Sequence, residues 1–200
     1  MRLYRNIFEN FAAKRKMKKI PAGTILVAEP FMEDPHFKRS VVLVCDNEEG
    51  GTIGFILNKP QLRMNITELI AEFPDFESEV HYGGPVATDT IHYLHNQGHL
   101  LDGSQKVAPG VYWGGEFEKL KVLVATGLIL PEHIRFFLGY SGWAAGQLDS
   151  ELQHGSWIAS EMDPNYLYRE SADSLWRRAL EDKGDTFGVI GQMPEGISPN

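Results

Sequence analysis

Apolar residues recur along the chain with two spacings, one typical of strands and one typical of helices. Short apolar or β-branched runs bounded by turn residues predict strands at 24–28, 40–45, 52–57, 80–82, 90–95, 134–140 and 186–190. Apolar residues three and four apart predict helices at 66–73, 116–126 and 171–183. The strands at 40–45 and 52–57 flank an acidic, Gly-rich turn, so we expect them to pair as a hairpin. Residues 96–109 are expected to form a loop, because Gly and Pro interrupt them.

The ends of the predicted helices carry start and stop signals. Asn65 followed by Glu68 matches a capping box, and Ser171 stands where the last helix begins. The segment 116–126 fits two structures: its Val-Leu-Val run favours a strand, whereas its apolar spacing and the following Gly127 favour a helix. We expect the helix.

The stretch 137–151 has the most unusual pattern in the chain. Gly139 and Gly142 follow a run of bulky apolar residues and predict a sharp turn, because glycine reaches backbone angles that other residues avoid. Leu148 and Leu152 then repeat at helical spacing. A second stripe at intervals of four residues consists of Trp143, Gln147 and Glu151. We therefore expect a strand that turns abruptly into a helix.

The turn contains Gly-Tyr-Ser-Gly-Trp at 139–143, which nearly matches the Gly-x-Ser-x-Gly nucleophile elbow of hydrolases. Trp143 stands where the elbow needs its last glycine, and no His has a sequence context that marks it as the catalytic base. Ser141 is therefore expected to cap the helix. A small hydrolase stays the alternative. The start of a helix can also bind a small anion, here with Gly83, Gly84 or Lys59 beside it.

Other reactive residue types carry weaker signals. His92 and His95 are three apart on a predicted strand, so their side chains should point to opposite faces, and a metal site that includes His99 is not expected. The pair Asp34 and His36 could perform acid–base chemistry, but it stands in a polar loop that is more simply solvated.

Composition indicates one globular domain. The 200 residues are 42% hydrophobic and 23% charged, and no apolar run approaches the roughly 20 residues that span a bilayer. Cys45 is the single cysteine, which excludes an intrachain disulfide and fits a reducing cytosol. It ends a Val-Val-Leu-Val run and precedes acidic residues, which favours a place in the core over a reactive thiolate.

Charge is distributed unevenly along the chain. The net charge is −8, but residues 1–19 carry seven Lys and Arg against one Glu, whereas the remaining residues carry 12 bases against 26 acids. An acidic body repels a phosphate backbone, so contact with nucleic acid is expected only through the first segment. Apolar residues at helical spacing in 1–11 predict an amphipathic helix, which could pack on the body or lie on a membrane or nucleic-acid surface.

Several spaced motifs in residues 21–191 resemble the AlgH/YqgE family, a bacterial family often labelled a transcriptional regulator. They include Gly-Thr-Ile-Leu at 23–26, Phe-Lys-Arg-Ser-Val-Val at 37–42, Gly-Phe-Ile-Leu-Asn-Lys-Pro at 54–60, His-Tyr-Gly-Gly-Pro-Val at 81–86, and the Gly-Tyr-Ser-Gly-Trp stretch with Gly-Gln-Leu at 146–148. The motifs at 110–115 and 136–137 resemble the Bacteroidetes branch.

The resemblance implies an α+β fold: a single compact domain with a curved, largely antiparallel or mixed sheet and flanking helices. We place this domain at 21–193, after a basic amphipathic segment 1–20 and before a frayed tail 194–200. The resemblance also implies a cytoplasmic protein without a known cofactor. Many family members carry Ala where this chain has Ser141, which weakens the hydrolase alternative.

We therefore expect a non-enzymatic regulatory or adaptor domain that binds a protein partner or a small ligand, without catalytic or metal-binding residues and without a transmembrane segment. The expected binding surface comprises Asn58, Lys59, Gly83, Gly84, Tyr140, Ser141 and Gln147.

Overall fold

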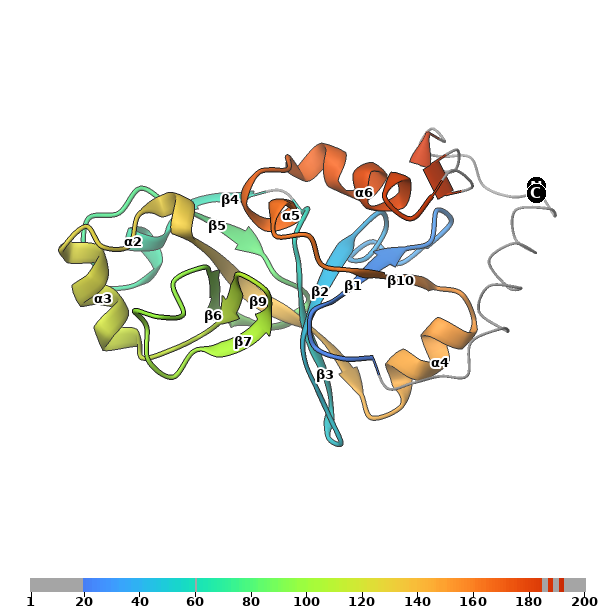
Figure 1. The fold of residues 1–200 in the computed structure, drawn as a ribbon, viewed down its shortest axis with the longest axis horizontal. Coiled ribbons are helices and arrows are strands. Elements are labelled where there is room, and N and C mark those ends of the chain that lie inside the picture. Colours follow the sequence, from blue (N-terminus) through green and yellow to red (C-terminus); the bar gives the residue numbers. More distant parts are fainter. Residues whose placement is uncertain (1–19, 60, 185–186, 189–190, 193–200) are drawn as a thin grey trace.

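The computed structural model describes residues 20–59, 61–184, 187–188 and 191–192, and ten strands of this part form one sheet (Figure 1). The strands are β1 (Thr24–Ala28), β2 (Val41–Glu48), β3 (Gly51–Ile56), β4 (Gln61–Asn65), β5 (Glu79–Tyr82), β6 (Val86–His95), β7 (Gln105–Ala108), β8 (Val111–Trp113), β9 (Ile134–Ala144) and β10 (Trp157–Glu161). Their order is β10-β1-β2-β3-β9-β6-β8-β7, and β5 joins β9 to β4. Only the β5–β9 pair is parallel among these strands.

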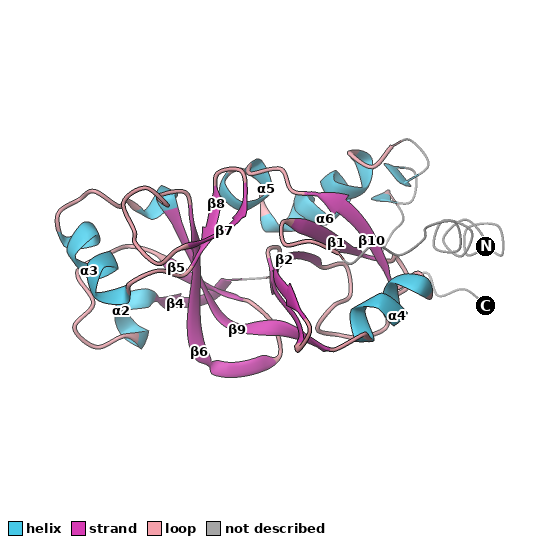
Figure 2. Ribbon diagram, turned by 60° about the horizontal axis from the view of Figure 1, so that its bottom comes forward, coloured by secondary structure: helices cyan, strands magenta, loops and turns pink. Residues whose placement is uncertain are grey.

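Helices cover both faces of this sheet. They are α2 (Ile66–Leu69), α3 (Phe117–Ala125), α4 (Gln147–Gln153), α5 (Asn165–Tyr168) and α6 (Ala172–Glu181), with a 3₁₀ turn η1 (Pro131–His133) before β9. In Figure 1, α5 and α6 lie on one side of β1, β2 and β10, and α4 lies on the other. Figure 2 shows α2 and α3 together at the opposite end of the molecule. The result is an α+β domain with a curved, mixed sheet, as the family resemblance implies.

The sheet curls so that β7, at one end of the strand order, contacts β2 near the other end. The Gln105 side chain on β7 donates a hydrogen bond to the carbonyl of Cys45 on β2, at 3.2 Å. The largest core cluster fills the inside of the curl with residues from β1, β2, β3, β7 and β8, together with apolar residues of α5 and α6. Cys45 belongs to this cluster and is fully buried, as its sequence context indicates, and burial raises the pKa of its thiol.

Strand β9 runs through the middle of the sheet, and a bulge of its partner β6, between Val86 and Ile91, lies opposite Gly139. Gly139 has a φ of +67°, which favours glycine, and the register between β6 and β9 shifts at this level. Phe137 and Tyr140 are three residues apart, yet both pack in the cluster inside the curl. Trp143 packs in the cluster on the opposite face, under α4. The bulge therefore decides which side chains of the 137–143 stretch point inward.

Most of the predicted strands are present, and several predictions were wrong. The chain does not turn between Gly139 and Gly142, because β9 continues to Ala144 and α4 begins only at Gln147. The expected loop at 96–109 contains β7. The strands β4, β8 and β10 and the short helix α5 were not predicted. These elements are short, and their sequences show no strong pattern of apolar and polar residues. They therefore depend on contacts with neighbouring elements.

The predicted helices agree better with the structure than the predicted strands do. Both hydrogen bonds of the capping box at Asn65 form, but α2 ends at Leu69 instead of residue 73. The ambiguous segment is the helix α3, and α6 starts after Ser171, whose side chain makes no capping bond. Of the strand expected at 186–190, the structure describes only residues 187 and 188. Both are helical, so the prediction was wrong there. The predictions for 1–19 and 193–200 lie outside the described residues.

Within the described part of the chain, no helix is long and apolar enough to cross a membrane.

Candidate functional site

The backbones of three strands meet where Gly83 follows β5. The N–H of Gly83 donates to the carbonyl of Leu138 at 2.9 Å. The Gly83 carbonyl accepts the N–H of Ile56 at 3.0 Å and the hydroxyl of Ser141 at 3.1 Å. This point ties β3 and β9 to the end of β5. Gly83 and Ser141, 58 positions apart in sequence, are thus in direct contact.

Only glycine fits at this crossing. A Cβ on Gly83 would lie 2.2 Å from the carbonyl oxygen of Gly139, and a Cβ on Gly84 would lie 2.3 Å from that of Tyr140. Real Cβ atoms do not approach backbone oxygens so closely. The Gly-Gly pair is therefore explained by close backbone packing, and the Gly83 amide is already bonded to Leu138.

Ser141 occupies a buried strand position. Its side chain is fully buried, and its hydroxyl hydrogen is used in the bond to Gly83. The residue that precedes α4 is Gly146, with a φ of +76° and no side-chain capping bond, so the expectation that Ser141 caps the helix was wrong. The strand continues past Ser141 to Ala144 and contains the positive φ of Gly139 without turning.

Asn58 and Lys59 fasten the end of β3 to the loop before β2. Asn58 accepts the N–H of Val41 and donates to the carbonyl of Arg39, both at 2.8 Å. The Lys59 ammonium donates to the carbonyl of Lys38 at 3.0 Å. The oxygen and the nitrogen of the Asn58 side-chain amide are thus both bonded to backbone, one at the first residue of β2 and one in the loop before it.

Gln147 belongs to a different group of side chains at the start of α4. It accepts the N–H of Ala144 at 3.0 Å and donates to Glu151 at 2.9 Å. The other oxygen of Glu151 accepts the indole N–H groups of Trp143 at 2.9 Å and Trp157 at 2.7 Å. The predicted stripe is therefore in contact, although Trp143 lies on β9 and not on the helix.

The structure brings together only part of the expected site. Gly83, Gly84, Tyr140 and Ser141 are neighbours. Gln147 lies beyond the Gly51–Ala144 pair, and Asn58 lies seven positions along the chain from Gly51. At about 3.3 Å per residue, these two ends of the β3–β9 pair are roughly 20 Å apart.

Tyr140 is part of an aromatic group that the sequence did not reveal. His92 packs against the rings of Phe55 at 5.2 Å, Tyr140 at 5.7 Å and Trp113 at 6.3 Å. All four residues come from different strands, so no spacing in the sequence could have connected them. Trp113 and Tyr140 are only partly buried, which leaves polar and apolar ring surface at the edge of the inner core.

The hydrogen bonds of His92 fix its tautomer. Thr90 uses its only hydroxyl hydrogen to donate to the carbonyl of Ala87 at 2.8 Å. Its oxygen lies 3.0 Å from Nε2 of His92, so this nitrogen must carry the hydrogen. Burial lowers the pKa of His92, which favours the neutral ring. Nδ1 therefore keeps a lone pair.

The other histidines are separated from this group. His95 pairs with Ile134 and His92 with Phe137, so the two histidines lie on opposite faces of β6, as expected. His95 is buried, with Nε2 at 2.9 Å from the carbonyl of Gly114. No group of three or more metal-ligating side chains occurs in the described ranges.

The Asp34–His36 pair forms a loop contact. Asp34 accepts the backbone N–H of His36 at 2.8 Å, and Nδ1 of His36 lies 2.9 Å from the hydroxyl of Tyr82. Burial, with a smaller contribution from Asp34, raises the pKa of Tyr82. The pair thus attaches the loop to the end of β5.

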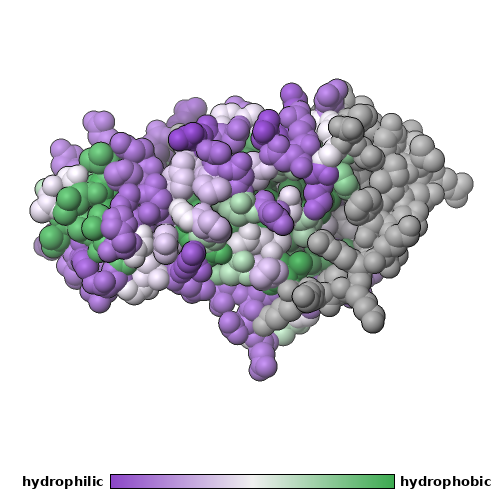
Figure 3. All heavy atoms as spheres, viewed as in Figure 1, coloured by the Kyte–Doolittle hydropathy of each residue, from purple (hydrophilic) through white to green (hydrophobic). Residues whose placement is uncertain are grey.

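Aliphatic side chains are exposed at the end of the molecule that carries α3. Val122 is 60% exposed, Leu128 54% and Leu130 40%, and these are the exposed large apolar residues of the described part. Figure 3 shows apolar atoms gathered over α3. We call Val122, Leu128 and Leu130 the α3 patch. A contiguous exposed apolar surface commonly marks an interaction site.

The comparisons with known proteins agree on one family. Residues 25–188 match the AlgH-like family. The UPF0301 protein of Pelodictyon phaeoclathratiforme is 40% identical over 177 residues, covering 88% of this chain and 94% of the relative, and that of Cytophaga hutchinsonii is 38% identical over 173 residues, covering 86% and 94%. The solution structure of the AlgH protein from Pseudomonas aeruginosa has a TM-score of 0.68 at 26% identity, covering 92% of this chain and all of that one. The chain belongs to the AlgH-like family, as a member of the Bacteroidetes type.

Proposed function

We propose that this protein is a non-enzymatic regulatory or adaptor domain that binds a protein partner through the α3 patch. The observation that carries the proposal is the exposure of three large aliphatic side chains on one short segment, between 40% and 60% each. Exposed apolar side chains gain free energy when a partner removes them from water, at about 25 cal/mol per Å².

The surroundings of the patch favour a protein partner. Charged side chains flank α3, where Lys119 pairs with Asp102 and Lys121 with Glu118. An apolar centre with a charged rim is the usual composition of a protein interface. Of the residues expected from the sequence, Tyr140 and Gln147 keep side-chain surface at other places and stay candidate contacts for a ligand.

A hydrolase at Ser141 is the alternative, and the local geometry does not favour it. The hydroxyl is buried and donates to a carbonyl, whereas a nucleophile needs a base that accepts its proton. In the described part of the chain, no histidine or carboxylate side chain is hydrogen-bonded to Ser141. A screen of ester and phosphoester substrates against wild type and Ser141→Ala tests this alternative, and turnover that the substitution abolishes would establish it.

The experiment for the partner proposal compares two full-length variants in affinity capture from a bacterial lysate with quantitative mass spectrometry. Val122→Lys/Leu128→Lys places charge in the α3 patch and should reduce the captured partner at least tenfold, because burying an unpaired charge costs more than the apolar contact gains.

The control is Thr88→Lys/Gln153→Lys, which adds the same charge at two exposed positions elsewhere. It should capture the partner as wild type does. Identical partner lists for all three proteins would contradict the proposal.

A further inference from the structure

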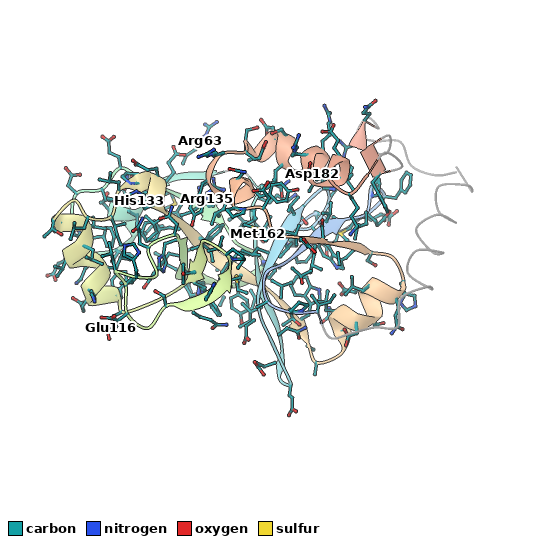
Figure 4. All side chains as sticks on the ribbon, viewed as in Figure 1. Arg63, Glu116, His133, Arg135, Met162 and Asp182 are labelled. Atoms are coloured by element: carbon teal, nitrogen blue, oxygen red, sulfur yellow. The ribbon has the colours of Figure 1, made fainter. Side chains whose placement is uncertain are left out.

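Three polar side chains from β5, β9 and α5, apart from the residues considered above, lie near enough for the charge of one, Arg135, to act on the other two, His81 and Tyr168. His81 lies opposite Phe137 in the parallel β5–β9 pair, so Arg135, two residues earlier on β9, is a diagonal neighbour on the same face. Tyr168, the last residue of α5, packs on the core at this face. Figure 4 shows Arg135 in the middle of the molecule, beside the segment that carries α5.

The polar atoms of this group are incompletely bonded. Arg135 makes one long hydrogen bond, from Nη1 to the carbonyl of Leu57 at 3.4 Å. No carboxylate of the described residues lies within ion-pair distance of it. The Tyr168 hydroxyl and Nδ1 of His81 are both inaccessible to solvent and have no hydrogen-bond partner. Unsatisfied buried polar groups are rare in folded proteins, so the Tyr168 hydroxyl and Nδ1 of His81 call for a partner, and the half-buried Arg135 adds a charged fork beside them.

The group carries a single positive charge. Burial lowers the pKa of Arg135 to about 10, so its guanidinium stays charged at neutral pH. Burial, and then the charge of Arg135, lower the pKa of His81 to about 3, so its ring is neutral. Burial raises the pKa of Tyr168, which keeps its proton. The group therefore offers one cation and two neutral donors.

We propose that Arg135, Tyr168 and His81 bind the carboxylate of a small organic acid. A carboxylate has about four lone-pair positions. The guanidinium fork fills two of them, the Tyr168 O–H a third and the Nδ1–H tautomer of His81 the fourth. One negative charge balances Arg135, whereas a phosphate dianion would leave an excess negative charge buried.

The ligand enters by a local opening. The Tyr168 hydroxyl and Nδ1 of His81 are closed to solvent, and α5 is a single short turn of four residues. Because Tyr166 and Leu167 of α5 pack in the core, this opening costs part of that packing, but less than global unfolding.

Thermal unfolding of the full chain tests the site, with acetate or propionate titrated against chloride at constant ionic strength and with phosphate in parallel. A monocarboxylate at about a hundred times its Kd should raise Tm by roughly 5–10 °C. Arg135→Met should abolish the rise. Arg135→Lys, which keeps the charge and loses the fork, should weaken Kd about tenfold. Tyr168→Phe should weaken it several-fold.

The control is Arg178→Met, which removes an arginine from an exposed ion pair with Asp182 and should keep the wild-type response. An equal rise in wild type and Arg135→Met, or no rise with either monocarboxylate, would overturn the proposal. A larger rise with phosphate would overturn the choice of ligand. If Arg135→Met does not fold, a wild-type response in Tyr168→Phe would be decisive against the site.

Discussion

At the scale of single residues, several positions that look chemical in the sequence have structural roles. Gly83 lets β5 approach β9, and Ser141 uses its hydroxyl to hold that contact. Asn58 satisfies two backbone groups at the start of β2, one in the strand and one in the loop before it. Glycine, serine and asparagine are common both at ligand sites and where backbones cross closely. Residue type alone therefore cannot separate the two roles.

Gly83→Ala tests the structural role of the crossing. The added Cβ would meet a backbone oxygen at 2.2 Å, so strands must separate, and we expect the free energy of unfolding to fall by about 3 kcal/mol or more. Urea denaturation followed by circular dichroism measures it. Gly50→Ala is the control, because nothing lies within 4 Å of its Cβ, and it should change stability by less than about 0.5 kcal/mol. Equal effects of the two substitutions would contradict the assignment.

At the scale of elements, one carboxylate attaches α4 to two strands. Glu151 accepts the indole N–H groups of Trp143 on β9 and Trp157 on β10, and both tryptophans are buried. Phe37, from the loop before β2, packs against both indoles, with ring centroids 6.0 Å from Trp143 and 5.5 Å from Trp157. The helix has only seven residues and no side-chain cap, so tertiary contacts have to stabilise it.

Glu151→Ala should therefore destabilise the protein by about 2–3 kcal/mol, since two buried indole donors lose a charged acceptor. The near-ultraviolet circular dichroism of the tryptophans should change, and urea unfolding gives the energy. Gln153→Ala, at an exposed position of the same helix, should stay within about 0.5 kcal/mol of wild type. A similarly small effect at Glu151 would show that the carboxylate does not hold the helix.

At the scale of the whole molecule, charge limits the possible partners. The excess of acids over bases after residue 19 repels nucleic acid, whereas residues 1–19 carry an excess of bases. The apolar α3 patch lies in the acidic part. Binding of a protein partner and binding of nucleic acid are thus expected at different parts of the chain.

Any binding of DNA or RNA by the full chain should therefore be weak and lost between low and physiological salt. Lys16→Glu/Lys18→Glu/Lys19→Glu should abolish it, because counterion release depends on these cations. Gel shifts at two salt concentrations measure this, with Lys106→Glu as an exposed control in the body. Binding that survives both the triple substitution and physiological salt would place a nucleic-acid site in the acidic body.

The sequence by itself determined the local features of this protein. Short apolar runs located β1, β2 and β3, helical spacing located α3 and α6, and the capping box located the start of α2. These features depend on neighbours in sequence. The spaced motifs also indicated the family and hence the α+β class.

Only the tertiary structure decided how distant segments combine. The crossing of Gly83 with Ser141, the ring contacts of His92 with Tyr140, and the pairing of His81 beside Arg135 all join residues more than 40 positions apart. Their formation depends on sheet register and on the bulge opposite Gly139, which a spacing rule cannot contain. The turn expected at Gly139 does not form, because β9 continues through this position, paired with β6 on one side and with β5 and then β3 on the other.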